Sequence, residues 1–259
     1  MEIRAISPKN LVNQEALLRL CFPNSNLDRA YLKWLYFANP LGNVVGFDAM
    51  DGNTLAAHYA CIPTQIDGKL GLLSLNTATH PNYRFKGLYQ KLAIQTYENW
   101  STQFDFVVGV ANGQSAAGFV KRLGFTELGR LNLRFGDLKR PPTGNRTWTK
   151  AEIDWRTMSP RQKLEKRLLN NGMIELSMRP KSFPFKIKSL VSITDSEIRQ
   201  NLEQIDNRRG FTVDWVKGSK PRLYLPEKLK PSPLVMIYKS LNSNDHEINS
   251  WSFPDFDAF

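Results

Sequence analysis

The sequence predicts a protein of the α+β (α/β) class, built on a mixed, mostly antiparallel sheet that is flanked by helices. Three observations support this class. Helical and strand-like periods alternate through the first 138 residues. The pairs Asp51-Gly52 and Asp67-Gly68 each lie between strand-like runs, and such pairs supply the positive φ that a tight hairpin turn requires. After Leu138 the composition changes, which predicts a separate C-terminal α+β extension.

The elements of the first half follow from hydrophobic period and from boundary residues. A helix is expected to begin after the polar residues at 26–28 and to end at the Asn-Pro pair at 39–40. In chain order we expect an edge strand at 3–6, helices at 10–21 and 28–38, strands at 43–50, 54–65 and 70–79, a helix at 84–100, a strand at 105–111, a short helix within 112–125 that ends at Gly124, and a last strand.

The second half begins at 139–146 with a basic segment rich in proline and glycine, which predicts a linker between a domain of residues 1–138 and one of residues 139–259. Beyond it we expect a helix at 160–170, an extended stretch at 180–193, a helix at 195–208 and short strands at 233–239 and 250–253. The pattern Tyr31-x-x-Trp34 is echoed by Phe211-x-x-x-Trp215, so one interpretation of the extension is a partial copy of the first half.

The net charge of +11 is concentrated in the second half. Residues 139–240 contain 22 Lys and Arg against 10 Asp and Glu, so this segment carries +12 and the rest of the chain −1. Such an excess attracts nucleic acid, an acidic membrane face or a polyanionic substrate, or is simply a solvated surface. The sequence contains no helix-turn-helix, zinc-finger or aromatic-basic sheet motif, which argues against nucleic acid.

Cysteine content and hydropathy bear on the compartment. The only cysteines, Cys21 and Cys61, lie neither in a Cys-x-x-Cys pair nor beside histidines at zinc spacing, so neither a disulfide framework nor a metal site is expected. No apolar run approaches the roughly 18 residues of a membrane-spanning helix, and the first residues lack the features of a signal peptide. These observations predict a cytoplasmic protein without a membrane span.

The segment from residue 70 to residue 100 predicts an anion site. A strand at 70–79 is followed by a turn at 80–83 and by a helix that opens with Arg84, Phe85, Lys86 and Gly87. The first N–H groups of a helix have no partner within the helix and lie at the positive end of its dipole, so a pyrophosphate can accept hydrogen bonds from them. Gly87 allows the backbone to approach such a group closely.

Two motifs in order make this interpretation specific. The first is Arg84-x-x-Gly87-x-Tyr89 after a strand that ends in Thr-His-Pro, and the second is Asn112-x-x-Ser115 followed by a Leu-Gly-Phe sequence. Together they resemble the GNAT superfamily of acyl-CoA-dependent N-acyltransferases, over roughly residues 1–138. The segments 34–42 and 79–84 resemble the branch found among bacterial surface-polysaccharide enzymes, which make amino sugars.

The resemblance implies the GNAT fold, with an acyl-CoA-binding domain at 1–138 and a basic acceptor-side extension at 139–259, and it implies acetyl-CoA as cosubstrate. In that fold two neighbouring strands splay apart, and the pantetheine arm of the coenzyme pairs with the free backbone between them. The positions implied for coenzyme binding are Thr77, Ala78, Thr79, Arg84, Phe85, Lys86, Gly87, Leu88, Tyr89, Asn112, Ser115 and Phe119.

Acyl transfer also needs an oxyanion stabiliser, a base and a donor for the departing thiolate. The resemblance implies a backbone N–H near Thr79 as the stabiliser, but the family's usual donor, a tyrosine, is replaced by Val120. Tyr89, Ser115 or a water can supply the proton, thiolate departure can proceed unassisted, or the activity has been lost.

For the base, the candidates are Asn76, the one sizeable polar residue of the central strand, and His58 on the neighbouring strand. Imidazole titrates near neutrality, as deprotonation of an ammonium requires, although a packed core histidine is the simpler interpretation of His58. At the C-terminus, aromatic and acidic residues alternate. If this tail docks over the acceptor, Asp255 or Asp257 holds the substrate amine, and otherwise both carboxylates are solvated or paired with basic residues.

The sequence therefore favours an enzyme that moves an acetyl group from acetyl-CoA to a primary amine by direct attack on the thioester, with a nucleotide-linked amino sugar as the expected acceptor. Arginines of the extension suit a nucleotide diphosphate, namely Arg156, Arg161, Arg167, Arg179, Arg208, Arg209 and Arg222. The alternatives are a small amine or protein lysine as acceptor, a longer acyl chain, or a coenzyme-binding module without catalysis whose basic half docks on a polyanion. The oligomeric state is open, and a homodimer is one arrangement the sequence allows.

Overall fold

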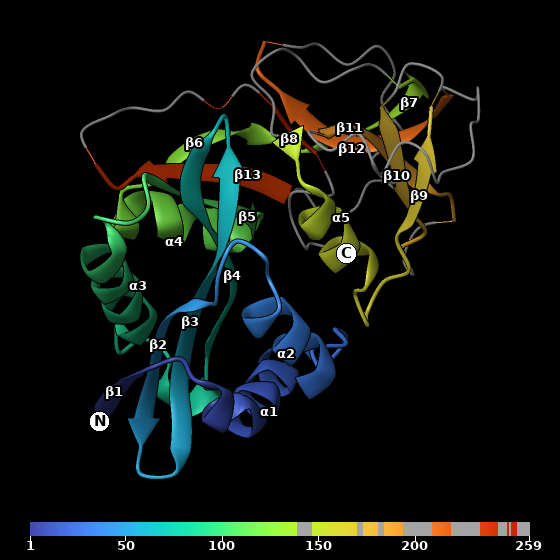
Figure 1. The fold of residues 1–259 in the computed structure, drawn as a ribbon. Helices are drawn as coiled ribbons and strands as arrows, with labels where there is room; N and C mark the ends of the chain where they lie inside the picture. The colour runs from blue at the N-terminus through green and yellow to red at the C-terminus, as the bar shows by residue number, and fades with distance from the viewer. Residues whose placement is uncertain are drawn as a thin grey trace.

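The computed structural model describes residues 1–138, 147–169, 173–180, 184–193, 209–218, 234–242, 248 and 250–252 of the chain. Within these residues the strands form two sheets, one in each half of the molecule (Figure 1). Helices cover both faces of the first sheet, and a further helix, α5, lies between the two sheets. The α+β class predicted from the sequence is confirmed.

The first sheet is mixed and mostly antiparallel, as expected. Its strands, in spatial order, are β1 (Glu2–Ala5), β2 (Val45–Asp51), β3 (Thr54–Ile66), β4 (Lys69–Thr79), β5 (Phe106–Asn112), β13 (Leu234–Ser240) and β6 (Thr126–Arg130). Only the β4–β5 pair is parallel, and the chain between these strands crosses over through α3. The two predicted hairpins join β2 to β3 and β3 to β4, with Gly52 and Gly68 at positive φ.

Four helices pack on this sheet, two on each face (Figure 1). One face is covered by α1 (Leu11–Cys21) and α2 (Arg29–Phe37), and the other by α3 (Leu88–Trp100) and α4 (Gly113–Leu123). The predicted start of α2 is confirmed, because the side chain of Asp28 accepts a hydrogen bond from the N–H of Tyr31 at 2.8 Å. Short 3-10 turns at Pro8–Asn10 and Pro81–Tyr83 precede α1 and α3.

The second sheet contains β14 (Ser250–Ser252), β12 (Arg209–Val216), β11 (Ile187–Ile193), β10 (Ile174–Met178) and β9 (Glu165–Leu168). Two more strands join it, β7 (Asn132–Asp137) beside β12 and β8 (Thr147–Trp148) beside β11. The strands predicted near 233–239 and 250–253 are confirmed as β13 and β14. The helix expected at 195–208 lies outside the described residues.

The helix expected at 160–170 is wrong. The helix of this region is α5 (Lys150–Thr157), which begins earlier because Thr149 and Glu152 form a reciprocal capping box at its start. Residues Glu165–Leu168 instead form β9, which pairs with β10 in antiparallel register. The leucines at 164 and 168 have helical spacing, but backbone pairing with a buried neighbouring strand outweighs local propensity.

The two sheets do not divide the chain at residue 138. Strand β7 precedes that position and belongs to the second sheet, whereas β13 follows it by almost a hundred residues and lies between β5 and β6 in the first sheet. Seven register pairs join β13 to β5, from Leu234↔Asn112 to Ser240↔Phe106. Each half therefore supplies one strand to the sheet of the other, and the boundary at 138 stays a prediction about domains.

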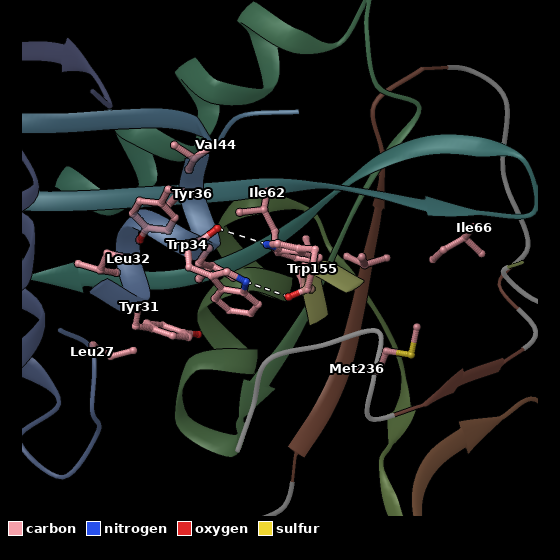
Figure 2. Packing of buried hydrophobic residues seen from close by; sticks show 14 of the residues in the cluster. Leu27, Tyr31, Leu32, Trp34, Tyr36, Val44, Ile62, Ile66, Trp155 and Met236 are labelled. Carbon is pink, nitrogen blue, oxygen red and sulfur yellow. Dashed lines mark hydrogen bonds between the residues drawn. The ribbon is translucent and has the colours of Figure 1, made fainter. Parts of the chain in front are cut away.

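The largest hydrophobic cluster also spans both halves. It includes Leu32 and Tyr36 of α2, Ile62 of β3 and Met236 of β13, and it continues to Trp155 of α5 (Figure 2). A second cluster fills the opposite face of the first sheet, under α3 and α4. Burial on both faces explains why β3 and β4 are nearly continuous apolar runs rather than alternating ones.

Candidate functional site

Strands β4 and β5 separate in the middle of the first sheet. Their parallel pairing runs only from Gly71↔Phe106 to Ser74↔Gly109. Beyond that point β5 continues along β13 and β4 continues along β3, as far as the pair Thr79↔Ala57. The edge of β4 that faces β5 is therefore open from residue 75 to residue 79, which is the free backbone that the sequence predicted there.

The open edge presents the backbone N–H of Thr79. The N–H of His80 points toward β3, because it donates to the carbonyl of Ala56 at 2.9 Å. Neighbouring N–H groups of an extended strand point to opposite edges, so that of Thr79 points to the open edge. The carbonyl of Thr79 is contacted by the Cys21 thiol at 3.4 Å and by Arg84 Nε at 3.5 Å.

A β-bulge lies within this open stretch of β4. The register between β3 and β4 shifts from Ala60↔Leu75 to His58↔Ala78, so that two residues of β4, Asn76 and Thr77, lie opposite one residue of β3. Asn76 has a φ of +51°, in the left-handed region that asparagine tolerates better than most residues. Bulges of this kind redirect side chains and are frequent beside active sites.

The turn that follows β4 leads into an uncapped helix. The helix α3 begins at Leu88 rather than at the predicted Arg84, because Phe85 and Gly87 have φ values of +64° and +69°. Gly87 is the N-cap residue and supplies no side chain to the first N–H groups of α3, and the space beside its Cα is open. The side chain of Phe85 is fully exposed. The start of α3 thus offers unpaired donors to an anion.

A pocket of about 510 Å³ lies between the end of β4 and the helices α3 and α4. It brings together five of the residues predicted for coenzyme binding: Thr77, Thr79, Tyr89, Ser115 and Phe119. Four other residues of α4 complete its wall and were not predicted: Ala117, Gly118, Lys121 and Arg122. Their helical spacing beside Ser115 was the available signal, because residues three and four apart share one face of a helix. The volume is in the range of small-ligand sites.

The remaining predicted coenzyme residues lie around the pocket rather than in its lining. Ala78 is buried in the core, and Arg84, Phe85, Lys86 and Gly87 form the exposed turn before α3. Leu88 packs against the core under α3.

Asn112 has a structural role at the pocket edge. As the N-cap of α4, it accepts a hydrogen bond from the N–H of Ser115 at 2.8 Å through its side-chain oxygen. The hydroxyl of Ser115 is also within hydrogen-bond distance of that oxygen, at 2.9 Å. The pair therefore sets the position at which α4 begins, and only Ser115 lines the pocket.

His58 lies outside this pocket, fully buried on the α1–α2 face of the sheet. Its Nδ1 is 2.6 Å from Oδ1 of Asp48, and its Nε2 is 2.9 Å from the hydroxyl of Tyr36. The amide nitrogen of Asn76 donates to the same hydroxyl at 3.0 Å. The structure thus brings together two of the predicted catalytic residues, His58 and Asn76, but through Tyr36, which was not predicted.

Burial and hydrogen bonding determine the charge states in this group. Burial alone raises the pKa of Asp48, but the ion pair with His58 and hydrogen bonds from His58, Asn10 and Gln14 outweigh it, so the pKa of this carboxyl is lowered. Burial raises the pKa of Tyr36 far above its ordinary value. Asp48 is therefore a carboxylate and Tyr36 a neutral phenol near neutral pH.

Comparisons with known proteins bear on the fold. No family model and no curated protein matches this sequence. Among solved structures, a probable N-acyltransferase of unknown function from Enterococcus faecalis covers 93% of this chain and 72% of its own length, with a TM-score of 0.56 and 9% identity. Its match extends through both halves of the chain. The sequence resemblance implied an open edge of β4 and a turn before α3, and the bulge is a further feature that the structure adds. The chain has the fold of this probable N-acyltransferase.

Two smaller structures of this fold were found in complex with the coenzyme. A GNAT family N-acetyltransferase from Escherichia coli with bound CoA is 20% identical, covers 48% of this chain and 68% of its own, and has a TM-score of 0.38. A GNAT family acetyltransferase from Brucella melitensis with bound acetyl-CoA is 19% identical, covers 48% of this chain and 82% of its own, and has a TM-score of 0.41. The present chain extends well beyond these matched regions.

The sequence resemblance placed the usual proton donor at the position of Val120, which carries no hydroxyl, whereas Tyr89 supplies a hydroxyl at the pocket. Val120 packs against the core under α4, whereas Tyr89 reaches across from α3 to line the pocket. Its hydroxyl lies 3.1 Å from the position that a Cβ on Gly118 would occupy. The glycine in the middle of α4 therefore makes room for the phenol of Tyr89.

The expected acceptor-side residues are only partly described. Asp255, Asp257, Arg208 and Arg222 lie outside the described residues. The other arginines lie in different surroundings: Arg156 is buried beside the Trp155 ring, Arg161 lies over the ring of Tyr31, Arg167 is 3.8 Å from Glu165, Arg209 pairs with Asp137, and Arg179 is exposed. Among the helices that the structure describes, none is long and apolar enough to cross a membrane.

Proposed function

We propose that this protein is an acyl-CoA-dependent N-acyltransferase that moves an acetyl group from acetyl-CoA to a primary amine. One observation carries the proposal: the open backbone edge of β4 and Tyr89, in the first turn of the uncapped helix α3, line a single pocket. An extended pantetheine arm needs unpaired strand backbone, and a pyrophosphate needs helix N–H groups. The pantetheine arm would pair with β4 and the pyrophosphate with the start of α3, in the order in which these two parts of CoA are joined.

The charges around the pocket agree with this ligand. Lys121 and Arg122 line the pocket wall on α4, and Arg84 and Lys86 lie in the exposed turn before α3. All four are cations near the place proposed for phosphates, where charge-assisted hydrogen bonds are strong. No acidic side chain is among the residues that line this pocket.

The proposed reaction is direct attack of the amine on the thioester. The amine nitrogen forms a bond to the carbonyl carbon, and the carbonyl oxygen becomes an oxyanion, which the N–H of Thr79 on the open edge stabilises. The carbon–sulfur bond then breaks, and the thiolate takes a proton from the hydroxyl of Tyr89, which lines the same pocket. Tyr89 thus replaces the donor that is missing at Val120.

Within this proposal the acceptor is the amine of a nucleotide-linked sugar. The excess of 12 positive charges at 139–240 supports a phosphate-bearing acceptor, as does the resemblance of residues 34–42 and 79–84 to amino-sugar enzymes. The amine would approach the thioester from the face of β4 that carries Asn76, because the coenzyme pocket occupies the other face.

The first test is calorimetric titration of the protein with CoA and acetyl-CoA, followed by thiol release with glucosamine, a UDP-linked amino sugar and benzylamine. We expect binding, and release that depends on the UDP-linked amine. Replacing Lys121 and Arg122 by glutamate should weaken CoA binding by about tenfold or more, because each lost charge contact contributes on the order of 1 kcal/mol. Lys33→Glu, an exposed site on α2 at the opposite face, is the matched control.

Each contrary result has its own meaning. Binding of acetyl-CoA without release by any amine would support a coenzyme-binding module that lacks catalysis. Release with glucosamine and benzylamine at the rate of the UDP-linked sugar would contradict the nucleotide-sugar acceptor while supporting the transferase. Absence of CoA binding in the folded protein would contradict the assignment of the pocket and of the α3 turn.

A further inference from the structure

A chain of buried polar side chains crosses the first sheet on the face opposite the coenzyme pocket. It runs from Asp48 on β2 through His58 on β3 to Tyr36 on α2 and ends at Asn76 on β4. Asp48, His58 and Tyr36 are at most 1% exposed, whereas Asn76 is half-buried. Tyr36 lies within the large hydrophobic cluster, as Figure 2 shows. The half-buried residue is therefore the end at which the chain can exchange a proton with another molecule.

The hydrogen bonds of this chain all point the same way. Asp48 is a carboxylate and can only accept, so Nδ1 of His58 carries the proton and donates to it. With a proton on Nδ1, Nε2 is the ring nitrogen that lies 2.9 Å from the Tyr36 hydroxyl and that takes up a second proton from it. The amide nitrogen of Asn76 donates to the Tyr36 oxygen. A proton that enters at the Tyr36 oxygen can thus be passed to His58 without any side chain turning.

The carboxylate end of the chain is fully occupied. Oδ2 of Asp48 accepts from Asn10 Nδ2 at 2.6 Å and from Gln14 Nε2 at 2.8 Å, while Oδ1 faces His58. The titratable groups that act on Tyr36 and His58 are Asp48 on β2 and Cys61 on β3. Burial raises the pKa of Cys61 to about 12, so the thiol stays neutral. Asp48 is then the single negative partner available to a protonated His58 among these groups.

Packing alone accounts poorly for this arrangement. An apolar set of the same size is generally as stable as a buried ion pair, because removing charges from water is costly. The end residue, Asn76, also has a strained left-handed φ of +51° in the bulge. That bulge turns Asn76 toward Tyr36 on one face while its neighbour Thr77 lines the coenzyme pocket on the other. The chain therefore ends one residue from the lining of the coenzyme pocket.

We propose that Tyr36, His58 and Asp48 form a proton relay that removes the proton of the acceptor amine, with the side-chain oxygen of Asn76 holding that amine. The inference rests on the proposed transferase function. As the carbon–nitrogen bond forms, the amine proton passes to the Tyr36 oxygen while the Tyr36 proton passes to Nε2 of His58. The imidazolium pairs with Asp48. The thiolate takes its proton from Tyr89, and after product release His58 returns its proton through Tyr36 to solvent, from which Tyr89 is also reprotonated.

In this scheme Asn76 is the group that meets the substrate, and the Tyr36 hydroxyl, 3.0 Å behind its amide nitrogen, takes up the proton. His58 and Asp48 act through Tyr36 and are positioning residues. The scheme differs from a direct role for His58, because Tyr36 lies between His58 and Asn76. It also predicts that substitutions of Tyr36 and of His58 lower kcat to a similar extent. Substitution of Asp48 acts indirectly, by changing the tautomer of His58.

The experiment compares Tyr36→Phe, His58→Gln and the wild-type protein, with acetyl-CoA and the fastest amine among the three named above. Loss of a proton acceptor should lower kcat by about 100-fold or more in each variant, with CoA binding unchanged within about twofold. The pH profile of kcat should differ between the wild type and His58→Gln, because only the wild type has an imidazole at this position.

Tyr59→Phe is the matched control. Tyr59 is as fully buried as Tyr36. It lies on β3 next to His58 but faces the other side of the sheet, where its hydroxyl pairs with that of Tyr97 at 2.6 Å. Its removal costs a buried hydroxyl contact, as Tyr36→Phe does, and should leave the pH profile of kcat in place. The side-chain ¹⁵N spectrum of His58 gives a readout without turnover: the wild type should show the Nδ1–H tautomer, and Asp48→Asn should change it.

Retention of kcat within about threefold in Tyr36→Phe, with an unchanged pH profile, would overturn the relay alone. An Nε2–H tautomer in the wild type would overturn it as well, because Nε2 could not then accept from Tyr36. Wild-type protein that binds acetyl-CoA but releases no thiol with any of the amines would instead contradict the transferase proposal, and the relay with it.

Discussion

Trp34 and Trp155, which are 121 positions apart in the chain, donate hydrogen bonds to each other's backbone. Nε1 of Trp34 donates to the carbonyl of Trp155 at 2.9 Å, and Nε1 of Trp155 donates to the carbonyl of Trp34 at 3.3 Å. Their rings stack with centroids 5.0 Å apart and planes at 22° (Figure 2). This pair fastens α5 of the second half to α2 of the first, beside the proposed acceptor face.

The tryptophan pair predicts a stability change with a defined origin. Trp155→Phe keeps an aromatic ring but removes the indole N–H that donates to the Trp34 carbonyl, which keeps its hydrogen bond from the N–H of Ala38. It should lower the free energy of unfolding by about 1–3 kcal/mol, because a buried hydrogen bond is lost and the smaller ring leaves space beside Trp34. Equilibrium urea unfolding measures this. Met158→Ala, at an exposed position just after the same helix, should change stability by less than about 0.5 kcal/mol. Equal effects of the two substitutions would contradict the fastening role.

We expect substitution of Gly118 to affect catalysis rather than folding. In Gly118→Ala the new methyl group would lie 3.1 Å from the Tyr89 hydroxyl and displace it, while alanine favours the helix by up to about 1 kcal/mol. We expect kcat for thiol release to fall by about tenfold or more, with the melting temperature unchanged or higher. The double variant Gly118→Ala, Tyr89→Phe should be no slower than Tyr89→Phe alone. An additive loss would show that Gly118 acts independently of the hydroxyl.

Asn112 predicts a coupled loss at the start of α4. Asn112→Ala removes the acceptor of the Ser115 N–H and should lower the free energy of unfolding by about 0.5–2 kcal/mol. It should also weaken CoA binding, because Ser115 lines the pocket. Asn132→Ala serves as the control, since that side chain donates to the carbonyl of Arg130 at an exposed position. Unchanged stability and unchanged CoA affinity, in urea unfolding and calorimetry, would show that the cap is dispensable.

Asp154 predicts a pH-dependent contribution. Its pKa is lowered by hydrogen bonds from Lys150 at 2.6 Å and Lys166 at 2.8 Å. A carboxyl whose folded pKa is lowered stabilises the protein above its unfolded pKa, and this contribution is lost as pH falls through the folded value. Asp154→Asn should therefore cost less than about 1 kcal/mol at pH 7, because the site is partly solvated. In unfolding measurements the difference from wild type should shrink toward pH 3. A difference that is constant down to pH 3 would contradict this origin.

The sequence predicted the first half of the fold well because the residues that determine its turns and helix ends lie next to them in the chain. The Asp-Gly turns, the Asp28 cap and the Gly124 terminus each act within a few residues, and each is found where it was expected. Five of the residues that the resemblance implied for coenzyme binding line one pocket, whereas Asn112 caps α4. The error at 160–170 arose because pairing with a distant strand, β10, determined the conformation of a helix-like sequence.

The candidate proton chain was harder to see. His58 and Asn76 were predicted from their residue types. Tyr36 and Asp48 were not predicted, because Tyr36 lies in an aromatic, apolar helical segment and Asp48 in a strand-like one. No spacing in the sequence connects these four positions. Their connection depends on the register β2↔β3, in which Asp48 faces His58, and on the bulge that turns Asn76 toward α2.

The sequence by itself determined the elements of the first half, the turn before α3 and the uneven distribution of charge, because each depends on nearby residues or on composition. Only the tertiary structure decided that β13 completes the first sheet, that β7 leaves for the second, and that Trp34 meets Trp155. Contacts between distant segments depend on burial and backbone pairing across the whole molecule, and many registers satisfy the same apolar pattern until the complete core is assembled.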